Sequence, residues 1–341
     1  MTTPKATHQL QGSILAITPC EDSTFCVDNT FYITQINKKL EIQTSLQVTR
    51  DLEPPHRYSH AFGISNDSYF CIPIIGEKKS LILKLEHSKL KIISTLNDHD
   101  GEMESCAFSK NGNYFATGGQ DGRVFLYEGK SFLPTASLLA RSDYISTIKF
   151  SQNNEFIAIS GFDKFTMIFD VLRHKIAFNF VTNDVVEDSC FFENDEKLLL
   201  VLRNNSSIIF SLKEGKIISQ EYFFAFWPTS IALDDEENYA LIGTRSDTLY
   251  VISLKDNSKV MEIKNEHAGI ASLAFSHGFL YIGCIDGTLL IIDYNEGKEE
   301  LKDALATKNY KNAREAINKN VFLSIHPLTK IFDEVWPDIL N

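Results

Sequence analysis

The sequence predicts an all-β fold, a seven-bladed β-propeller with a short α-helical C-terminal extension. Two observations support this prediction. Short apolar runs end in anchor residues that recur at intervals of 41 to 46 residues. The spacing inside these runs is mostly alternating or continuous, which is typical of strands, whereas helical repeats show apolar residues three and four apart. The anchors are Ile17, Phe62, Phe108, Phe150, Phe192, Leu233 and Phe275.

The third unit shows, in order, the elements that we expect in each blade. Residues 105–108 end a first strand, and the polar turn at residues 109–112 contains Asn and Gly. Residues 113–118 form a second strand, and a turn with Gly and Asp at residues 119–122 leads into a third strand. Residues 90–96, in the preceding unit, show what a typical fourth strand looks like. Each unit therefore predicts a four-stranded antiparallel meander.

An acidic residue recurs in the turn between the second and third strands. It is Asp28, Asp121, Asp163 or Asp286 in four of the units. Asp accepts hydrogen bonds from turn amides, and Gly tolerates a positive φ in such turns. We therefore interpret these acids as turn-forming residues and not as catalytic carboxylates. The second unit has no such Asp in residues 72–80, so an altered hairpin is expected there.

The two ends of the repeat region complement one another. The last unit has no candidate fourth strand after Tyr294, whereas residues 6–11 precede the first unit where a fourth strand would lie. We expect this N-terminal strand to complete the last blade and to close the ring, which leaves no open edge between the first and last blades. The expected domains are a propeller over residues 1–294 and a helical extension over residues 295–341.

The pattern resembles the WD40 repeat family from residue 8 to about residue 294. His99 and His267 match the histidine that precedes the first strand in that family, 22 and 19 residues before Asp121 and Asp286. The resemblance implies a buried hydrogen-bond network from His99 to Thr117 and Asp121, and a pair between His267 and Asp286. The family's Trp is absent from the third strands. Its place is taken by Tyr127, Phe169, Phe210, Ile252 and Ile292.

Composition argues against several classes of partner. The chain has 45 acidic and 33 basic residues, a net charge of −12, and no basic cluster interleaved with aromatics, so nucleic acid is not an expected ligand. No sustained apolar segment predicts a signal peptide or membrane insertion, which makes the cytoplasm the expected location. The six cysteines are spread singly over the units, so they predict buried thiols and no metal site.

The sequence contains no recognisable catalytic motif. It has no Gly-x-Ser-x-Gly elbow, no phosphate-binding loop and no His-Glu-x-x-His. We therefore expect no enzymatic activity and no cofactor. Binding of a small ligand, or hydrolysis, in the central channel remains the alternative from another class.

The resemblance implies that partners bind the face that carries the links into the first strand of each blade. Positions five to six residues before each anchor should line the mouth of the channel on that face. Neighbouring Phe162 and Arg203 should fall near the same surface. Trp, Tyr, Met and Arg are enriched at interface hot spots. A packing role for Trp227 against the core is the alternative. The predicted partner-binding residues are Arg57, Tyr58, Glu102, Met103, Tyr144, Glu187 and Trp227.

The C-terminal 45 residues change from strand to helix spacing. Residues 298–307 and 310–320 predict two helices, and residues 327–336 predict a third that begins with Pro327. Three arrangements are open for this third helix: packing on the side or underside of the propeller, binding of a partner or a second copy, or the start of an α-solenoid. The third helix would form a tail interface with Leu328, Ile331, Phe332, Val335 and Trp336.

The sequence as a whole predicts a non-catalytic scaffold that mediates protein–protein interaction and complex assembly. Its partners would be proteins of unknown identity. A second alternative is a homo-oligomer formed through the C-terminal helices, with the propeller as a platform.

Overall fold

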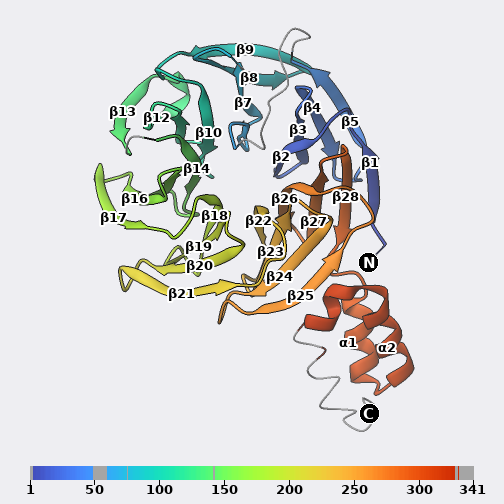
Figure 1. Ribbon diagram of the computed structural model, residues 1–341. Helices are drawn as coiled ribbons and strands as arrows, with labels where there is room; N and C mark the ends of the chain where they lie inside the picture. The colour runs from blue at the N-terminus through green and yellow to red at the C-terminus, as the bar shows by residue number, and fades with distance from the viewer. Residues whose placement is uncertain (1–2, 49–59, 75, 141–142, 327–328, 330–341) are drawn as a thin grey trace.

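The computed structural model describes residues 3–48, 60–74, 76–140, 143–326 and 329. In this part of the chain, seven antiparallel sheets of four strands are arranged in a ring, as Figure 1 shows, and their inner strands line a central channel. Two α-helices follow the last sheet, at residues 298–319. The predicted fold class, a seven-bladed β-propeller with a helical C-terminal extension, is confirmed.

The first four blades follow the chain from the channel outward. Blade 1 contains β2 (Ile14–Pro19), β3 (Ser23–Asp28), β4 (Tyr32–Asn37) and β5 (Ile42–Gln47). Blade 2 contains β6 (Gly63–Ile64), β7 (Tyr69–Ile74), β8 (Lys79–Glu86) and β9 (Lys89–Leu96). Blade 3 contains β10 (Met103–Phe108), β11 (Tyr114–Gly119), β12 (Arg123–Glu128), the short 3-10 helix η1 (Gly129–Ser131) and β13 (Pro134–Leu139). Blade 4 contains β14 (Ile145–Phe150), β15 (Phe156–Gly161), β16 (Phe165–Asp170) and β17 (Lys175–Val181).

The last three blades continue the same meander. Blade 5 contains β18 (Val186–Phe192), β19 (Lys197–Leu202), β20 (Ser206–Ser211) and β21 (Lys216–Tyr222). Blade 6 contains β22 (Pro228–Leu233), β23 (Tyr239–Thr244), β24 (Thr248–Ser253) and β25 (Lys259–Lys264). Blade 7 contains β26 (Ile270–Ser276), β27 (Phe279–Cys284), β28 (Thr288–Asp293) and, as its outer strand, β1 (Ala6–Gln9).

The N-terminal strand is part of the ring. β1 pairs with β28 from Ala6 opposite Ile291 to Gln9 opposite Thr288. His8 Nε2 also lies 2.7 Å from the carbonyl oxygen of Leu40 in blade 1. The first and last blades are thus held together by both backbone pairing and a side-chain contact, and the outer edge of β28 is covered.

A bulge near the start of the first strand sets the register in most blades. In blade 5, for example, the pairing with β19 skips from Val186 to Asp188 and leaves Glu187 outside the ladder. The anchors Phe108 and Phe150 occupy the same position of their strands, whereas the equivalent position in blade 5 is Phe191, one residue before the expected anchor. A pattern of apolar residues locates a strand, but the bulge decides which residue faces the core.

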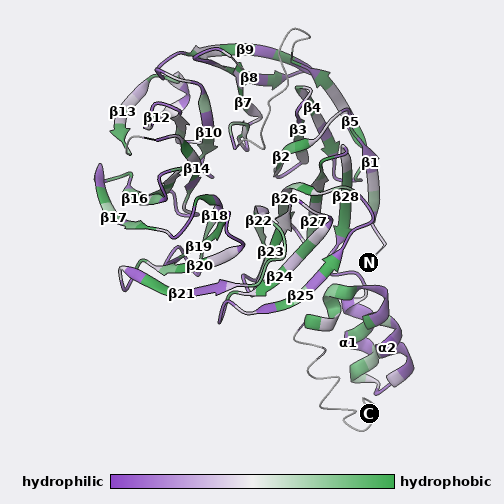
Figure 2. Ribbon diagram, viewed as in Figure 1, coloured by the Kyte–Doolittle hydropathy of each residue, from purple (hydrophilic) through white to green (hydrophobic). Residues whose placement is uncertain are grey.

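Hydrophobic side chains fill the spaces between adjacent blades. Figure 2 shows hydrophobic stretches within the strands and hydrophilic residues at many of the turns. Phe191 is only 3% exposed and packs against residues of blades 4 and 5. Phe108 and Phe150 are half-buried and line the central channel instead. Both rings also pack against the core clusters of their blades, so each lies at the boundary between the core and the channel.

The hydrogen-bond network implied by the family resemblance is present in blade 3. His99 Nδ1 lies 3.0 Å from Asp121 Oδ1, and its Nε2 lies 2.9 Å from Thr117 Oγ1. The hydroxyl of Tyr127, which stands in place of the family's Trp, donates to Asp98 at 2.8 Å. In blade 7 the corresponding contact is looser, because His267 Nδ1 and Asp286 Oδ2 are 3.8 Å apart.

The C-terminal extension packs against blades 6 and 7 through its ends. Its elements are α1 (Lys298–Ala306), α2 (Tyr310–Lys319) and the 3-10 helix η2 (Val321–Ile325). Asn320 Nδ2 donates to the carbonyl oxygen of Tyr294 at 2.9 Å, and the Phe322 ring lies 4.9 Å from the Tyr294 ring. The Tyr239 hydroxyl donates to the carbonyl oxygen of Ile325 at 2.9 Å. The α1–α2 hairpin itself extends to one side of the ring (Figure 1).

The predicted third helix and its tail-interface residues fall outside the described residues. These are Leu328, Ile331, Phe332, Val335 and Trp336. The described part of the extension packs on the propeller, whereas the three alternatives expected for the third helix are not tested and stay predictions. None of the helices in the described ranges is long and apolar enough to cross a membrane.

Candidate functional site

One face of the disc carries both the links between blades and the turns between second and third strands. In an antiparallel meander these two kinds of connection emerge on the same side, and backbone hydrogen bonds join them here. Phe162 N donates to Tyr144 O at 2.8 Å, and Arg245 N donates to Trp227 O at 2.8 Å. We call this side the link face. Its connections are fixed by the sheet framework, which gives the side chains on it defined positions.

A row of aromatic and arginine side chains crosses blades 4, 5 and 6 on the link face. The rings of Tyr144 and Phe162 are 6.0 Å apart in an edge-to-face arrangement. The Arg203 guanidinium lies 5.0 Å from the centre of the Phe162 ring and 4.4 Å from that of Trp227. The Arg245 guanidinium lies over the same indole at 5.4 Å. Contacts at these distances are cation–π interactions. We call these five residues the aromatic–arginine row.

Glu187 holds Arg203, at the centre of the row, in place. The bulge in β18 directs its carboxylate toward Arg203, whose Nε donates to Glu187 Oε1 at 2.5 Å. The Glu187 side chain is 19% exposed and that of Arg203 is 33% exposed. Burial raises the pKa of the Glu187 carboxyl, and the Arg203 guanidinium opposes this shift. The half-buried carboxylate thus holds the guanidinium between two aromatic rings.

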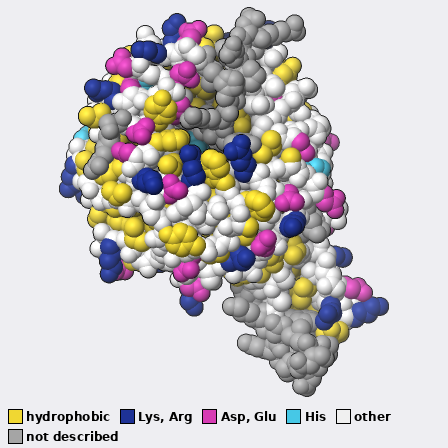
Figure 3. All heavy atoms as spheres, in the orientation of Figure 1, with side chains coloured by type: hydrophobic (Ala, Val, Ile, Leu, Met, Phe, Trp, Pro, Cys, Tyr) yellow, Lys and Arg dark blue, Asp and Glu magenta, His cyan; other side chains and the backbone are white. Residues whose placement is uncertain are grey.

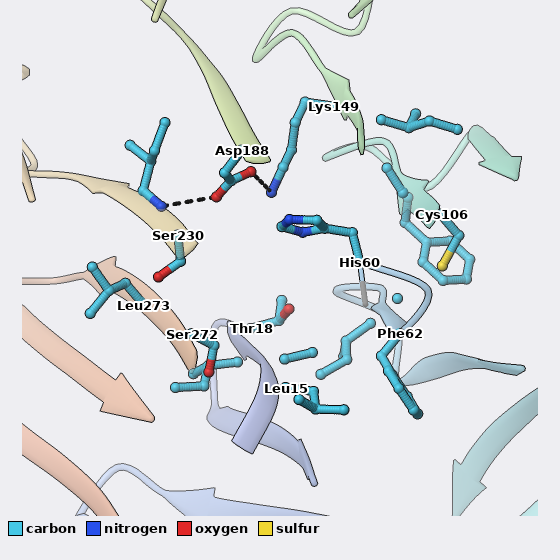
Figure 4. Close-up of a pocket in the computed structure, with 18 of the residues that line it drawn as sticks. Leu15, Thr18, His60, Phe62, Cys106, Lys149, Asp188, Ser230, Ser272 and Leu273 are labelled. Carbon is cyan, nitrogen blue, oxygen red and sulfur yellow. Dashed lines mark hydrogen bonds and ion pairs between the residues drawn. The ribbon is translucent and has the colours of Figure 1, made fainter. Parts of the chain in front are cut away.

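The next residue, Asp188, connects the row to the central channel. Its carboxylate accepts a hydrogen bond from Ile231 N at 2.9 Å and pairs with Lys149 Nζ at 3.0 Å, which ties blade 5 to blades 4 and 6. His60 reaches across from the link into blade 2, with its Nε2 2.5 Å from the carbonyl oxygen of Glu187. Figure 4 shows His60, Lys149 and Asp188 pointing toward one another in the channel.

These side chains line a cavity of about 270 Å³ in the channel. Burial lowers the pKa of His60, which favours the neutral form of its imidazole. Among the described residues that line the cavity, Lys149 and Asp188 form an ion pair. Within the described ranges, His, Cys, Asp and Glu form no group of three that could hold a metal ion. The channel side chains act as a tie between blades.

Exposed apolar side chains flank the row toward the outer rim. Val181 and Tyr222 end β17 and β21, and they are 61% and 62% exposed. Phe226, next to Trp227, is 49% exposed. Figure 3 shows hydrophobic side chains next to Lys and Arg side chains on the face turned toward the viewer. Large apolar side chains gathered at exposed links are typical of interaction surfaces.

The structure brings together some of the predicted site residues and separates others. Tyr144 and Trp227 lie in the row, and Glu187 supports it. Glu102 is half-buried in the link into blade 3. Met103 is only 6% exposed, and its sulfur lies 3.8 Å from Cys71 Sγ in the core between blades 2 and 3. Met103 therefore has to be removed from the partner-binding face. The predicted residues Arg57 and Tyr58 lie outside the described residues.

Arg245 and the channel residues were not among the predicted site residues. A signal for Arg245 was present in the sequence. Phe162, Arg203 and Arg245 each follow the last residue of the second strand of their blade, at intervals of 41 and 42 residues. The same repeat period that located the blades would therefore have aligned these three positions. For His60 the sequence holds no comparable signal, because its contact with blade 5 joins residues 127 positions apart.

Comparisons with known proteins agree with this architecture. The family model described as "WD domain, G-beta repeat" matches residues 90–128, which include the His99 network. WD repeat-containing protein 1 of Gallus gallus is 30% identical over 123 residues, which are 34% of this chain and 20% of that protein. Actin-interacting protein 1 of Drosophila melanogaster is 24% identical over 134 residues, 38% of this chain and 22% of that protein.

A longer match has lower identity. Periodic tryptophan protein 2 homolog of Dictyostelium discoideum is 19% identical over 245 residues, 66% of this chain and 26% of that protein. The chain therefore spans about a fifth to a quarter of the length of these relatives. The repeat match and the seven four-stranded blades together show a seven-bladed β-propeller that contains a WD40 repeat and is similar to WD repeat proteins.

Proposed function

We propose that this protein is a non-catalytic scaffold that binds a protein partner on the link face of blades 4 to 6, in the cytoplasm. The observation that carries the proposal is the aromatic–arginine row, with Arg203 fixed between Phe162 and Trp227. Trp, Tyr and Arg are the residue types that contribute most to protein–protein binding. WD40 propellers generally bind proteins, which supports the same class of function.

The row is organised before any partner binds. Glu187 and two aromatic rings already hold the Arg203 side chain. The hydrogen bond from Ile231 N to Asp188 holds the backbone beneath it. A partner would therefore meet side chains that lose little conformational entropy on binding, which leaves more of the contact energy as affinity. The exposed Phe226 and Tyr222 would extend the apolar contact toward the rim.

Quantitative affinity capture from native lysate tests the proposal. The baits are the wild-type protein, Trp227→Ala, and Leu172→Ala as a control that removes an exposed apolar side chain on the opposite face. We expect Trp227→Ala to lose specific partners that Leu172→Ala retains. Equal recovery by all three baits would contradict the proposal. Because one relative is called actin-interacting protein 1, actin is a partner to examine by name.

We also propose that residues 1–294 form the propeller and residues 295–341 the extension. Tyr294 packs against Phe322, so a truncation at residue 295 would uncover the blade 7 core. A bait ending at His326 keeps these contacts and is the better test of the remaining tail. Loss of partners, or of self-association in sedimentation, from that bait alone would favour the tail as the working surface.

A further inference from the structure

We propose that the link face recognises an acidic, apolar segment of its partner, with a carboxylate received by Arg203 and an apolar side chain packed beside Trp227. This inference rests on the proposed function, because it names the chemistry of the partner that the same face would bind. It follows from the hydrogen-bonding state of Arg203, from the layering of charges on the face, and from the exposed apolar side chains beside them.

Arg203 has hydrogen-bond donors to spare. A guanidinium carries five N–H groups, and Arg203 uses its Nε–H to bind Glu187. Within the described part of the chain, no protein acceptor binds its two terminal amino groups. Stacking between Phe162 and Trp227 holds the plane of the guanidinium, at 5.0 and 4.4 Å from the ring centres. A fixed planar group with free terminal N–H groups is suited to a bidentate bond with a carboxylate.

The charges on this face are layered, with cations outside acids. In the Arg203–Glu187 pair the side chains are 33% and 19% exposed, respectively. In the neighbouring Lys164–Asp184 pair they are 45% and 27% exposed. In both pairs the acid lies deeper and the cation faces solvent, so an approaching partner meets positive charge first. The exposed Arg245 lies over the same indole as Arg203 and adds to this layer.

Among the described residues, two further acids lie beside the ends of the row and not at its centre. Asp143 lies beside Tyr144 at one end, and its Oδ1 accepts the Tyr144 amide at 2.8 Å. Asp247 lies beside Arg245 at the other end, and its Oδ1 accepts the Thr248 hydroxyl at 3.2 Å. The centre, at Arg203 and Trp227, therefore complements one carboxylate in spite of the net charge of −12 on the whole chain.

Apolar contacts are available next to that centre. Phe226 and Tyr222 are 49% and 62% exposed, and Tyr222 is held by a 2.7 Å hydrogen bond from Gln220 Nε2 to its hydroxyl. A partner segment with an Asp or Glu beside a Leu, Ile or aromatic residue would bury these side chains while its carboxylate binds Arg203. A carboxylate alone would gain little on an exposed surface, so both features are needed.

The test is selection of a displayed random peptide library on the wild-type protein, followed by affinity measurements on the recovered peptides. Arg203→Lys is the main variant, because it keeps a cation for Glu187 but cannot bind a carboxylate bidentately. Trp227→Ala reports on the face as a whole. Lys213→Ala is the matched control, since Lys213 is an exposed cation of the same blade on the opposite face. Circular dichroism confirms that each variant is folded.

We expect the recovered peptides to carry an acid beside an apolar residue. Replacing that acid by its amide should weaken binding about 10- to 100-fold, and Arg203→Lys should weaken it by a similar factor. The two changes together should cost little more than either alone. Lys213→Ala should have no effect.

Two other results would overturn the inference in different ways. One result is a set of peptides that bind Trp227→Ala more weakly than wild type but that lack an acid, or that bind Arg203→Lys as tightly as wild type. Such peptides would refute recognition of an acidic segment and leave the proposed function standing. Selection that yields no peptide sensitive to Trp227→Ala would refute the proposed function, and the inference with it.

Discussion

Replacing Asp188 with Ala should destabilise the propeller strongly, because one buried carboxylate ties three blades together. The Asp188 side chain is 3% exposed. It accepts hydrogen bonds from Ser189 N at 2.8 Å and from Ile231 N at 2.9 Å, and it pairs with Lys149 at 3.0 Å. Removing it leaves the Ile231 amide without its acceptor at a buried position, between blades 5 and 6.

The magnitude follows from these contacts. A hydrogen bond to a charged group contributes about 1.5–3 kcal/mol, and a buried amide left without an acceptor costs about 1–3 kcal/mol. The Lys149 side chain is 35% exposed and can turn to water, so its share is small. We expect Asp188→Ala to lower the free energy of unfolding by about 3–5 kcal/mol. Asp188→Asn keeps an acceptor oxygen for Ile231, and we expect about 1–2 kcal/mol.

Urea unfolding followed by circular dichroism measures both effects. The midpoint should fall for both variants, and further for Ala, at an unchanged dependence on denaturant. A loss below about 1 kcal/mol for Asp188→Ala would show that Asp188 does not hold the blades together, because each hydrogen bond removed is expected to contribute more than that. An Asn variant as unstable as the Ala variant would show that the ion pair with Lys149, and not the amide contact, holds the blades.

Three further predictions concern the core, the ring closure and a buried acid. Phe191→Ala should destabilise the fold by about 3–5 kcal/mol, whereas Phe150→Ala, at the same position of blade 4, should cost clearly less because that ring lines the channel; equal midpoints in urea would contradict this. Deleting residues 1–11 leaves β28 without its outer strand and should lower the melting temperature sharply, so an unchanged melting temperature would argue against closure by β1. Burial raises the pKa of Asp234 from 3.8 to about 6, with adjacent acids adding to the shift. The folded state therefore holds this proton more tightly than the unfolded state, and stability is lost as pH rises from about 4 to 6. Asp234→Asn should match wild type near pH 4 and exceed it by about 1–2 kcal/mol at pH 7; a constant difference across this range would show that the acid is not responsible.

Much of the fold could be predicted because every blade repeats the same four-stranded meander. Each needs a strand at the channel, and a polar turn must follow it, so the apolar runs recur with the blade period. The missing fourth strand after Tyr294 pointed to the N-terminus, and β1 does pair with β28. The network around His99 was implied by the resemblance to the WD40 repeat family, and the structure contains it.

The position of single side chains was harder to predict, for a physical reason. Neighbouring residues of a strand point to opposite sides, so a window of two residues always includes one that faces inward. Glu102 is half-buried at the link, whereas Met103 beside it is buried, and Tyr144 and Ile145 divide in the same way. Counting back from an anchor finds the link but does not separate these two kinds of residue.

The contact between Arg203 and Trp227 depends on the assembled ring. The two residues come from different blades, and a bulge turns Glu187 toward them. A single-residue shift, such as that between Phe191 and the anchor expected in blade 5, changes which side chains meet. Its position before an anchor and its residue type marked Trp227 as an interface candidate, but only the three-dimensional arrangement shows what holds it in place.

The most direct test of the central claim is the dissociation constant of a recovered partner for the wild-type protein, Trp227→Ala and Leu172→Ala, measured by titration calorimetry. Partner binding through the aromatic–arginine row predicts that Trp227→Ala weakens binding by at least about 30-fold, as expected for a hot-spot residue, while Leu172→Ala leaves the constant unchanged. Equal constants for all three proteins would contradict a partner site on the link face.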